Sequence, residues 1–207
     1  MAAVVLAAGL GTRMGGRIKP LLRIGNVPLL QHVVSVLDEA GYPSPIIVLG
    51  HGRHEILSEI DLSACRIAVN PDPALGLGSS LRTGLDAVDP DACGALVVHA
   101  DMPFLSPATI RAVAEAARGS LRKTPEARTV VAPAYRGKRG FPVFLPRTLF
   151  DEIKETCFGD HGAREYLARH PDELALLAVD DPGCLADIDT ESDRENAERM
   201  NRCSTPG

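Results

Sequence analysis

The sequence lacks tryptophan, and aromatic residues make up 4% of its 207 positions. It also lacks a basic excess: the formal net charge is -5, which argues against a nucleic-acid-binding surface. No apolar run is long enough to span a bilayer, and the N-terminus has no signal-peptide pattern. We therefore expect a cytoplasmic protein that binds neither nucleic acid nor membrane.

Several signatures of well-known sites are absent as well. The five cysteines form no CxxC pair, so neither a zinc knuckle nor a disulfide framework is indicated. The P-loop pattern GxxxxGK[ST] and the nucleophile elbow GxSxG do not occur. The segment GLGTRM departs from the dinucleotide fingerprint GxGxxG, because Met14 stands where the third glycine belongs. P-loop and α/β-hydrolase chemistry are therefore excluded, and a dinucleotide site is disfavoured.

What the sequence does contain is short apolar runs that alternate with helical periodicity. Continuous apolar strands between helices predict an α/β fold with a mostly parallel sheet covered on both faces. No repeat or low-complexity linker divides the chain, so we expect one domain over residues 1–202 and a disordered tail at 203–207. Strands are predicted at residues 3–7, 45–49, 66–69, 94–99, 129–132 and 142–145, and helices at 28–40, 53–60, from Ser79 or Ser80 to Val88, at 107–118 and at 163–169.

A glycine-rich, basic loop follows the first predicted strand. Gly9 and Gly11 remove side chains, so backbone N–H groups can approach an anion closely. Arg13 and Lys19 add positive charge to the same loop. A glycine-rich loop alone is as often a plain surface loop, but the two cations favour a triphosphate cradle. A second such loop, GLGSSL, places Gly78, Ser79 and Ser80 at a helix start, which suits a phosphate or a base edge; by itself it reads more simply as a turn with serine caps.

Acidic residues follow two other apolar runs. Asp101 comes directly after the predicted strand at 94–99, and Asp189 belongs to the segment DIDT. Mg²⁺ prefers hard oxygen ligands and often needs one or two carboxylates plus substrate phosphates. Two carboxylates from distant strands therefore predict one metal site. The alternative is that Asp101 is an ordinary turn residue and that Asp189 caps a following helix.

Two further segments are suited to an acidic substrate. Arg139 and Gly140 lie in a basic turn before a strand, and Asp160 and Arg164 lie in GDHGAR before a helix. The alternatives are a solvated hairpin for the first and a simple helix cap for the second.

These motifs occur together in the order typical of one family. LAAGLGTRMGG with Lys19, GLGSSL, DMP, RGFPV, GDHGAR and DIDT resemble the MobA-like nucleotidyltransferases, and most closely the MocA-like molybdenum cofactor cytidylyltransferases. The resemblance extends over nearly the whole chain and implies a Rossmann-like, three-layer α/β/α nucleotidyltransferase domain. Guanylyltransferase relatives typically carry LAGG where this chain has LAAG, so the resemblance favours CTP over GTP.

The resemblance also implies a reaction of the EC 2.7.7 type. CMP passes from CTP to a molybdopterin-type cofactor with Mg²⁺, giving molybdopterin cytosine dinucleotide and pyrophosphate. The molybdoenzyme or its maturation chaperone is a further partner that it suggests. The implied residues are Arg13, Lys19 and Asp101 for catalysis; Leu6, Ala7, Ala8, Gly9, Gly11, Thr12, Gly78, Ser79 and Ser80 for the nucleotide; Arg139, Gly140, Asp160 and Arg164 for the acceptor; and Asp101 and Asp189 for the metal.

Two departures from the family pattern leave alternatives open. One extra residue precedes Lys19, so Arg17 competes for its role, and Phe141 stands where the family often has a polar residue. Other readings are a nucleotidyltransferase that uses GTP or another acceptor such as a sugar or polyol phosphate, an NADH-dependent oxidoreductase, and a non-catalytic nucleotide sensor.

Overall fold

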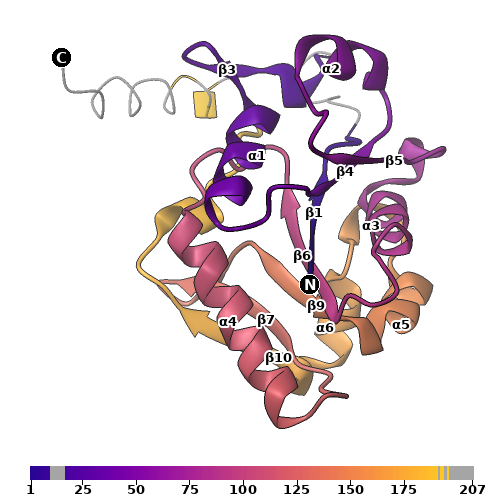
Figure 1. Cartoon of the computed structure of the whole chain (residues 1–207), viewed down its shortest axis with the longest axis vertical. Helices are drawn as coiled ribbons and strands as arrows, with labels where there is room; N and C mark the ends of the chain where they lie inside the picture. The colour runs from indigo at the N-terminus through magenta and orange to yellow at the C-terminus, as the bar shows by residue number, and fades with distance from the viewer. Residues whose placement is uncertain (10–16, 191, 194, 196–207) are drawn as a thin grey trace.

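The computed structural model describes residues 1–9, 17–190, 192, 193 and 195 (Figure 1). Its centre is an eight-stranded sheet with the order β10-β7-β9-β6-β1-β4-β5, and β8 pairs with β7. The strands of this sheet are β1 (Ala2–Leu6), β4 (Ile46–Leu49), β5 (Arg66–Val69), β6 (Gly94–His99), β7 (Val130–Tyr135), β8 (Lys138–Arg139), β9 (Val143–Pro146) and β10 (Leu174–Ala178). A separate two-stranded ribbon joins β2 (Arg23–Ile24) to β3 (Val27–Pro28).

Among the described residues, six α-helices connect and cover these strands. They are α1 (Leu29–Glu39), α2 (Arg53–Glu59), α3 (Leu77–Asp86), α4 (Pro107–Lys123), α5 (Phe150–Thr156) and α6 (Arg164–Arg169). Short 3-10 turns lie at Lys19–Leu21, Pro73–Leu75, Arg147–Leu149, Gly159–His161, Pro171–Glu173 and Pro182–Leu185. In the part of the chain that the structure describes, no helix is both long and apolar enough to cross a membrane.

The sheet is mostly parallel, as predicted. β1 pairs in parallel with both β4 and β6, β5 with β4, and β10 with β7. β9 runs antiparallel between β6 and β7, and the short strand β8 also pairs antiparallel with β7. The chain leaves β1 for β4 and β5 on one side and then returns through α3 to β6 on the other. This reversal of direction beside β1 is where parallel sheets bind ligands, because neighbouring connections diverge and leave a crevice.

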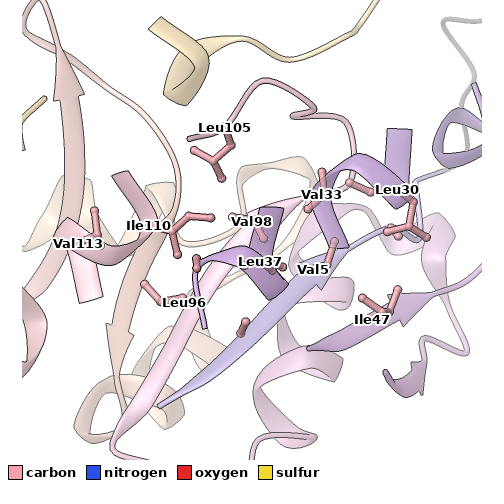
Figure 2. Packing of buried hydrophobic residues seen from close by; sticks show 14 of the residues in the cluster. Val5, Leu30, Val33, Leu37, Ile47, Leu96, Val98, Leu105, Ile110 and Val113 are labelled. Atoms are coloured by element: carbon pink, nitrogen blue, oxygen red, sulfur yellow. The ribbon is translucent and has the colours of Figure 1, made fainter. Parts of the chain in front are cut away.

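Alternation along β1 divides the hydrophobic core into two layers. Ala3, Val5 and Ala7 face one cluster, which α1 and α4 complete, whereas Val4, Leu6 and Ala8 face the cluster completed by α3, α5 and α6. Figure 2 shows the first layer, in which leucine and valine side chains of α1 pack on β1 and β6. Burial on both faces explains why these strands are continuous apolar runs, and the three layers are those of the predicted fold.

The structure differs from the prediction in several elements. The helix α5 and the strands β2, β3, β8 and β10 are not among the predicted elements, and the helix boundaries differ most at α3 and α4. α3 begins at Leu77, not at Ser79 or Ser80, because Gly76 adopts a φ of 88° and ends the preceding turn. α4 continues beyond residue 118 to Lys123. Its start is as predicted, since the Ser106 side chain accepts a hydrogen bond from the Ala108 amide at 3.1 Å and satisfies one of the free N–H groups of the first turn. The domain boundary at residue 202 stays a prediction, because it lies outside the described residues.

Candidate active site

Two cavities open at the sheet edge where β1 and β6 end. The first, cavity A, has a volume of about 340 Å³, and the second, cavity B, of about 270 Å³. Cavity A is lined by Leu6, Ala7, Ala8, Gly9, Lys19, Pro20, Pro73, Ala74, Gly76, Leu77, Ser80, His99, Ala100, Asp101, Asp160 and Asp189. Cavity B is lined by Leu6, Leu77, Leu81, Val97, His99, Asp101, Met102, Arg139, Gly140, Phe141, Val143, Leu145, Asp160, His161, Gly162, Ala163, Arg164, Leu167, Cys184, Leu185 and Asp187.

The cavities adjoin each other along a shared wall. Asp101, His99 and Asp160 line both, together with two leucines, Leu6 and Leu77. β6 ends at His99, and Asp101 follows two residues later, so the end of a buried strand fixes the middle of the wall. A molecule in cavity A and a second molecule in cavity B would therefore meet at Asp101.

The structure gathers most of the predicted nucleotide-binding residues around cavity A. Leu6, Ala7, Ala8, Gly9 and Ser80 line it. Gly78 and Ser79 line neither cavity. A Cβ atom on Gly78 would lie 2.4 Å from the carbonyl oxygen of Cys157, so this glycine lets α3 pack closely on the chain after α5.

Three predicted residues, Gly11, Thr12 and Arg13, lie outside the described residues. Their placement around the phosphates stays a prediction that rests on the family pattern. Lys19 lines cavity A, whereas Arg17 is exposed and lines neither cavity. The position of the Lys19 side chain in cavity A therefore favours Lys19 over Arg17 for the role at the phosphates.

Lys19 bridges the two carboxylates predicted to hold a metal. Its Nζ atom lies 2.5 Å from Oδ2 of Asp101 and 2.5 Å from Oδ1 of Asp189. Burial alone would lower the pKa of Lys19, but the attraction and hydrogen bonds of both carboxylates outweigh it and raise the pKa above its usual value. The lysine is therefore charged, and it neutralises an acidic cluster that burial would otherwise penalise.

The segment DIDT directs its two acids into different cavities. The Ile188 amide donates to the Asp101 carbonyl at 3.0 Å, and the Ile188 side chain is buried. Because side chains alternate along an extended segment, Asp187 lines cavity B and Asp189 lines cavity A. Burial, and then the nearby Asp189 and Asp101, raise the pKa of Asp187.

The donor set fits a divalent cation that also binds substrate phosphates. Asp101 Oδ1 is buried and has no hydrogen-bond partner in the described part of the chain, so a carboxylate oxygen remains for a further ligand. Among those same residues, no group of three or more His, Cys, Asp or Glu side chains gathers as a metal site. Asp101 and Asp189 alone suit Mg²⁺ or Mn²⁺, which complete their shells with phosphate oxygens and water.

The predicted acceptor residues all line cavity B. Arg139, Gly140, Asp160 and Arg164 come from two separate segments of the chain. Burial and then the neighbouring Arg164 lower the pKa of Arg139, so the two guanidinium groups repel each other there. An anion between them would relieve this repulsion and accept charge-assisted hydrogen bonds. Gly140 permits the close approach of Cys184, whose carbonyl oxygen would lie 2.3 Å from an added Cβ.

Sequence reasoning missed part of the shared wall. His99 is not among the predicted site residues, yet its ring lies 4.5 Å from that of Phe141 in the lining of cavity B, and burial lowers its pKa. Of the two acids in DIDT, the sequence predicts a role for Asp189 alone. The alternation of acidic and apolar residues in that segment was a signal for opposite orientations, but it did not say what each side would meet.

The chain is similar to known proteins along most of its length. Residues 3–174 match the sequence profile described as the MobA-like NTP transferase domain. Nicotine blue oxidoreductase from Paenarthrobacter nicotinovorans is 30% identical over 187 residues, which cover 90% of this chain and 91% of that protein.

Solved structures support the same fold. Rv0371c from Mycobacterium tuberculosis H37Rv aligns with a TM-score of 0.81 and 27% identity, covering 96% of each chain. The same protein is also known in a complex with manganese, so divalent metal occurs among these relatives. A nucleotidyl transferase from Methanothermobacter thermautotroptrophicus, Mth528, aligns with a TM-score of 0.76 and 26% identity, covering 97% of this chain and 98% of that one. The predicted fold class is confirmed.

Proposed function

The chain belongs to the MobA-like NTP transferase family, a family of nucleotidyltransferases, and we propose that it transfers CMP from CTP to a molybdopterin-type cofactor. The observation that carries this proposal is the pair of cavities that share Asp101. A transfer between two substrates needs two adjoining binding sites with a charge-stabilising group at their boundary. A protein that only binds a nucleotide has no need of the second site.

The proposed reaction is a displacement at phosphorus. An oxygen of the acceptor's terminal phosphate bonds to the α-phosphorus of CTP, and the bond from that phosphorus to the oxygen bridging to the β-phosphate breaks. The electron pair of the broken bond leaves with pyrophosphate. Such a reaction depends chiefly on alignment and on neutralising charge, which matches a site rich in cations and carboxylates.

The nucleotide side of the proposal rests on cavity A. Ala7, Ala8 and Gly9 have small side chains or none, so a ligand can approach the backbone after β1 closely. Lys19 supplies the cation that would contact the phosphates as charge builds on them. Gly11, Thr12 and Arg13 are proposed to complete the phosphate cradle, as in the family pattern.

A divalent cation, proposed as Mg²⁺, would be held by Asp101 and Asp189. When bound, it would supply Lewis-acid stabilisation and a template for the phosphates. These carboxylates place a negative surface next to the reacting phosphates, so a cation is needed for an anionic substrate to remain there. Lys19 contributes one positive charge to the same cluster.

The acceptor side rests on cavity B. Arg139 and Arg164 are proposed to bind the anionic part of the acceptor, and Asp160 to accept hydrogen bonds from its ring N–H groups. Gly140 also lines this cavity, and its missing side chain leaves room for the Cys184 backbone in the same wall. Asp160 also lines cavity A, so it would be in reach of both substrates.

The decisive test is pyrophosphate release by the full chain with Mg²⁺ and molybdopterin cofactor, comparing CTP, GTP, ATP and UTP. We expect release with CTP and a product whose mass is that of the cytosine dinucleotide. Equal turnover of GTP would contradict the base assignment. Turnover of CTP with a sugar or polyol phosphate, but not with molybdopterin, would replace the acceptor and keep the reaction class.

A redox function is the second candidate, because the relative from Paenarthrobacter nicotinovorans is named an oxidoreductase. The absence of a clean GxGxxG fingerprint weighs against it. An assay of NADH or NADPH oxidation with a quinoid dye as electron acceptor, followed by the absorbance of the reduced nicotinamide, would decide. Steady oxidation without pyrophosphate release would favour this second function.

A further inference from the structure

Asn70 and Ser80 form a buried polar pair beside cavity A. Asn70 is 3% exposed and Ser80 is 4% exposed, and they are two of the three buried polar side chains among the described residues. Asn70 follows β5 directly, and its amide donates to the Leu49 carbonyl at 2.8 Å. Buried polar groups cost free energy unless they are hydrogen-bonded. The hydrogen-bond partners of Asn70 and Ser80 therefore show which donor is left for a ligand.

The orientation of the Asn70 side chain is fixed by a backbone donor. The Asp72 amide donates to Asn70 Oδ1 at 3.0 Å, so that atom must be the carbonyl oxygen. The Nδ2 group therefore faces α3, where it donates to Ser79 Oγ at 2.8 Å and to Ser80 Oγ at 3.1 Å. Each of its two hydrogens has one hydroxyl as its acceptor.

The two hydroxyl groups differ in where their own hydrogens go. Ser79 Oγ lies 2.8 Å from the Gly76 carbonyl and 3.1 Å from the Asp72 carbonyl, so its hydrogen is used within the protein. Ser80 Oγ accepts from Asn70, and no acceptor in the described part of the chain takes its hydrogen. Because Ser80 lines cavity A, that hydrogen is left for a ligand.

The part of cavity A around Ser80 suits a base and not a phosphate. The apolar residues Pro73, Ala74 and Leu77 line the same cavity as Ser80, and Leu77 lies one turn before it on α3. The charged group near this turn is a carboxylate, since a Cβ atom on Gly76 would lie 2.6 Å from Oδ1 of Asp160. A planar ring gains contact with apolar walls, while a phosphate there would lose its hydration without gaining a cation.

We infer that Asn70 is a positioning residue that fixes the Ser80 hydroxyl as a hydrogen-bond donor to an acceptor atom of the nucleobase. Cytosine offers two such atoms on its pairing edge, a carbonyl oxygen and an unprotonated ring nitrogen. This inference rests on the proposed function, since it takes the ligand of cavity A to be a nucleotide. It adds a determinant of base preference that lies outside the LAAG segment.

The test compares a nucleotide with a ligand that has no base. Isothermal titration calorimetry on the full chain with Mg²⁺ would measure the affinity for CTP and for tripolyphosphate. Ser80→Ala removes the donor. Asn70→Asp puts an acceptor where the amide donor stood, so the Ser80 hydrogen turns toward it and away from the ligand. Thr83→Ala is the matched control, because its hydroxyl lies one turn further along α3 and bonds to the Ser79 carbonyl.

We expect both Ser80→Ala and Asn70→Asp to weaken CTP binding about tenfold, the effect of losing one neutral hydrogen bond, with tripolyphosphate affinity unchanged. Thr83→Ala should leave both affinities unchanged. Wild-type CTP affinity in Ser80→Ala would overturn the inference, and so would a parallel loss of tripolyphosphate binding, which indicates a general structural effect. If Asn70→Asp does not fold, Asn70→Ala replaces it, because it removes the amide donor to Ser80 without burying a charge. Wild-type CTP affinity in the Asn70 variant that folds would overturn the positioning role.

The same titrations with GTP, ATP and UTP separate this inference from the proposed function. If the wild type prefers GTP and Ser80→Ala removes that preference, the donor is confirmed and CTP is not the substrate. If the wild type prefers CTP and Ser80→Ala keeps the full preference, the proposed nucleotide stands and the inference is wrong. If no nucleotide binds, both are wrong.

Discussion

Asp101 is the residue on which both cavities depend. It follows a fully buried strand, contacts Lys19, and leaves one oxygen without a hydrogen-bond partner in the described residues. Its position at a strand end allows a charge to be held at the rim of the sheet without a loop that must first become ordered. Substitutions here should therefore affect chemistry more than folding.

We expect Asp101→Asn to lower kcat at least about 100-fold, because it removes a charge that would hold the metal where the transition state develops charge. Pyrophosphate release would measure this, and urea denaturation should show little change in stability. Asp91→Asn is the control, since Asp91 is exposed and precedes the same strand at its opposite end. Near-normal turnover by Asp101→Asn would refute the metal role.

Lys19 and a divalent cation have the same two carboxylates as partners. We expect Lys19→Met to raise the affinity for Mn²⁺ in the absence of nucleotide severalfold, because the competing ammonium is gone, while it lowers turnover. Electron paramagnetic resonance of Mn²⁺ would measure the affinity directly. Lys154→Met is the matched control, because Lys154 also bridges two carboxylates, Asp86 and Asp151, at 3.0 Å each on the surface. Unchanged or weaker Mn²⁺ binding by Lys19→Met would contradict the competition.

α3 connects the nucleotide side of the site to the rest of the fold. Its first turn carries Ser80, and its glycines allow close packing: Gly78 lies against the Cys157 backbone, and a Cβ atom on Gly84 would lie 2.6 Å from a methyl group of Val4. The helix therefore cannot shift without disturbing both the core below it and the chain that leads to Asp160. Its glycines are selected by packing more than by ligand contact.

A pair of glycine substitutions tests this view. Gly78→Ala should reduce the free energy of unfolding by about 1–3 kcal/mol, the usual cost of overpacking, because the added methyl group meets backbone atoms. Gly119→Ala in α4 should instead raise it by about 0.5–1 kcal/mol, since nothing lies within 4 Å of its Cβ position. Urea denaturation would measure both. If both substitutions changed the free energy of unfolding equally, close packing at Gly78 would not be the reason that a glycine is needed there.

At the scale of the whole molecule, the two cavities are formed mostly by different parts of the chain. Residues before Asp101 form most of cavity A, and residues from Arg139 onward form most of cavity B. The antiparallel strand β9 lies between β6 and β7 and places Val143 and Leu145 in the lining of cavity B. Relatives can therefore vary the second half while keeping the first.

This arrangement predicts separable kinetic effects. Arg139→Ala and Arg164→Ala should each raise KM for the acceptor about tenfold to a hundredfold, as expected for losing a hydrogen bond to a charged group, with little change in KM for CTP. Initial rates at varied concentrations of each substrate would measure this. Lys138→Ala is the control, because Lys138 is also a cation of β8 but lines neither cavity. Parallel increases in both KM values would contradict two independent sites.

The sequence by itself determined the alternation of apolar strands with helices, the basic loop after β1 and the family. These follow from local patterns, because burial on two faces gives continuous apolar strands and helical periodicity gives amphipathic helices. It also identified Asp101, Lys19, Arg139 and Arg164 as charged residues in suitable segments.

Only the tertiary structure decided which of these residues meet. Lys19, Asp101 and Asp189 are far apart along the chain, and their contact depends on the crossovers that bring three segments to one sheet edge. The buried bond from Asn70 to Ser80, the start of α3 at Leu77 and the opposite directions of Asp187 and Asp189 depend on it too. Packing and hydrogen-bond direction are properties of atoms in space, and no local sequence pattern specifies them.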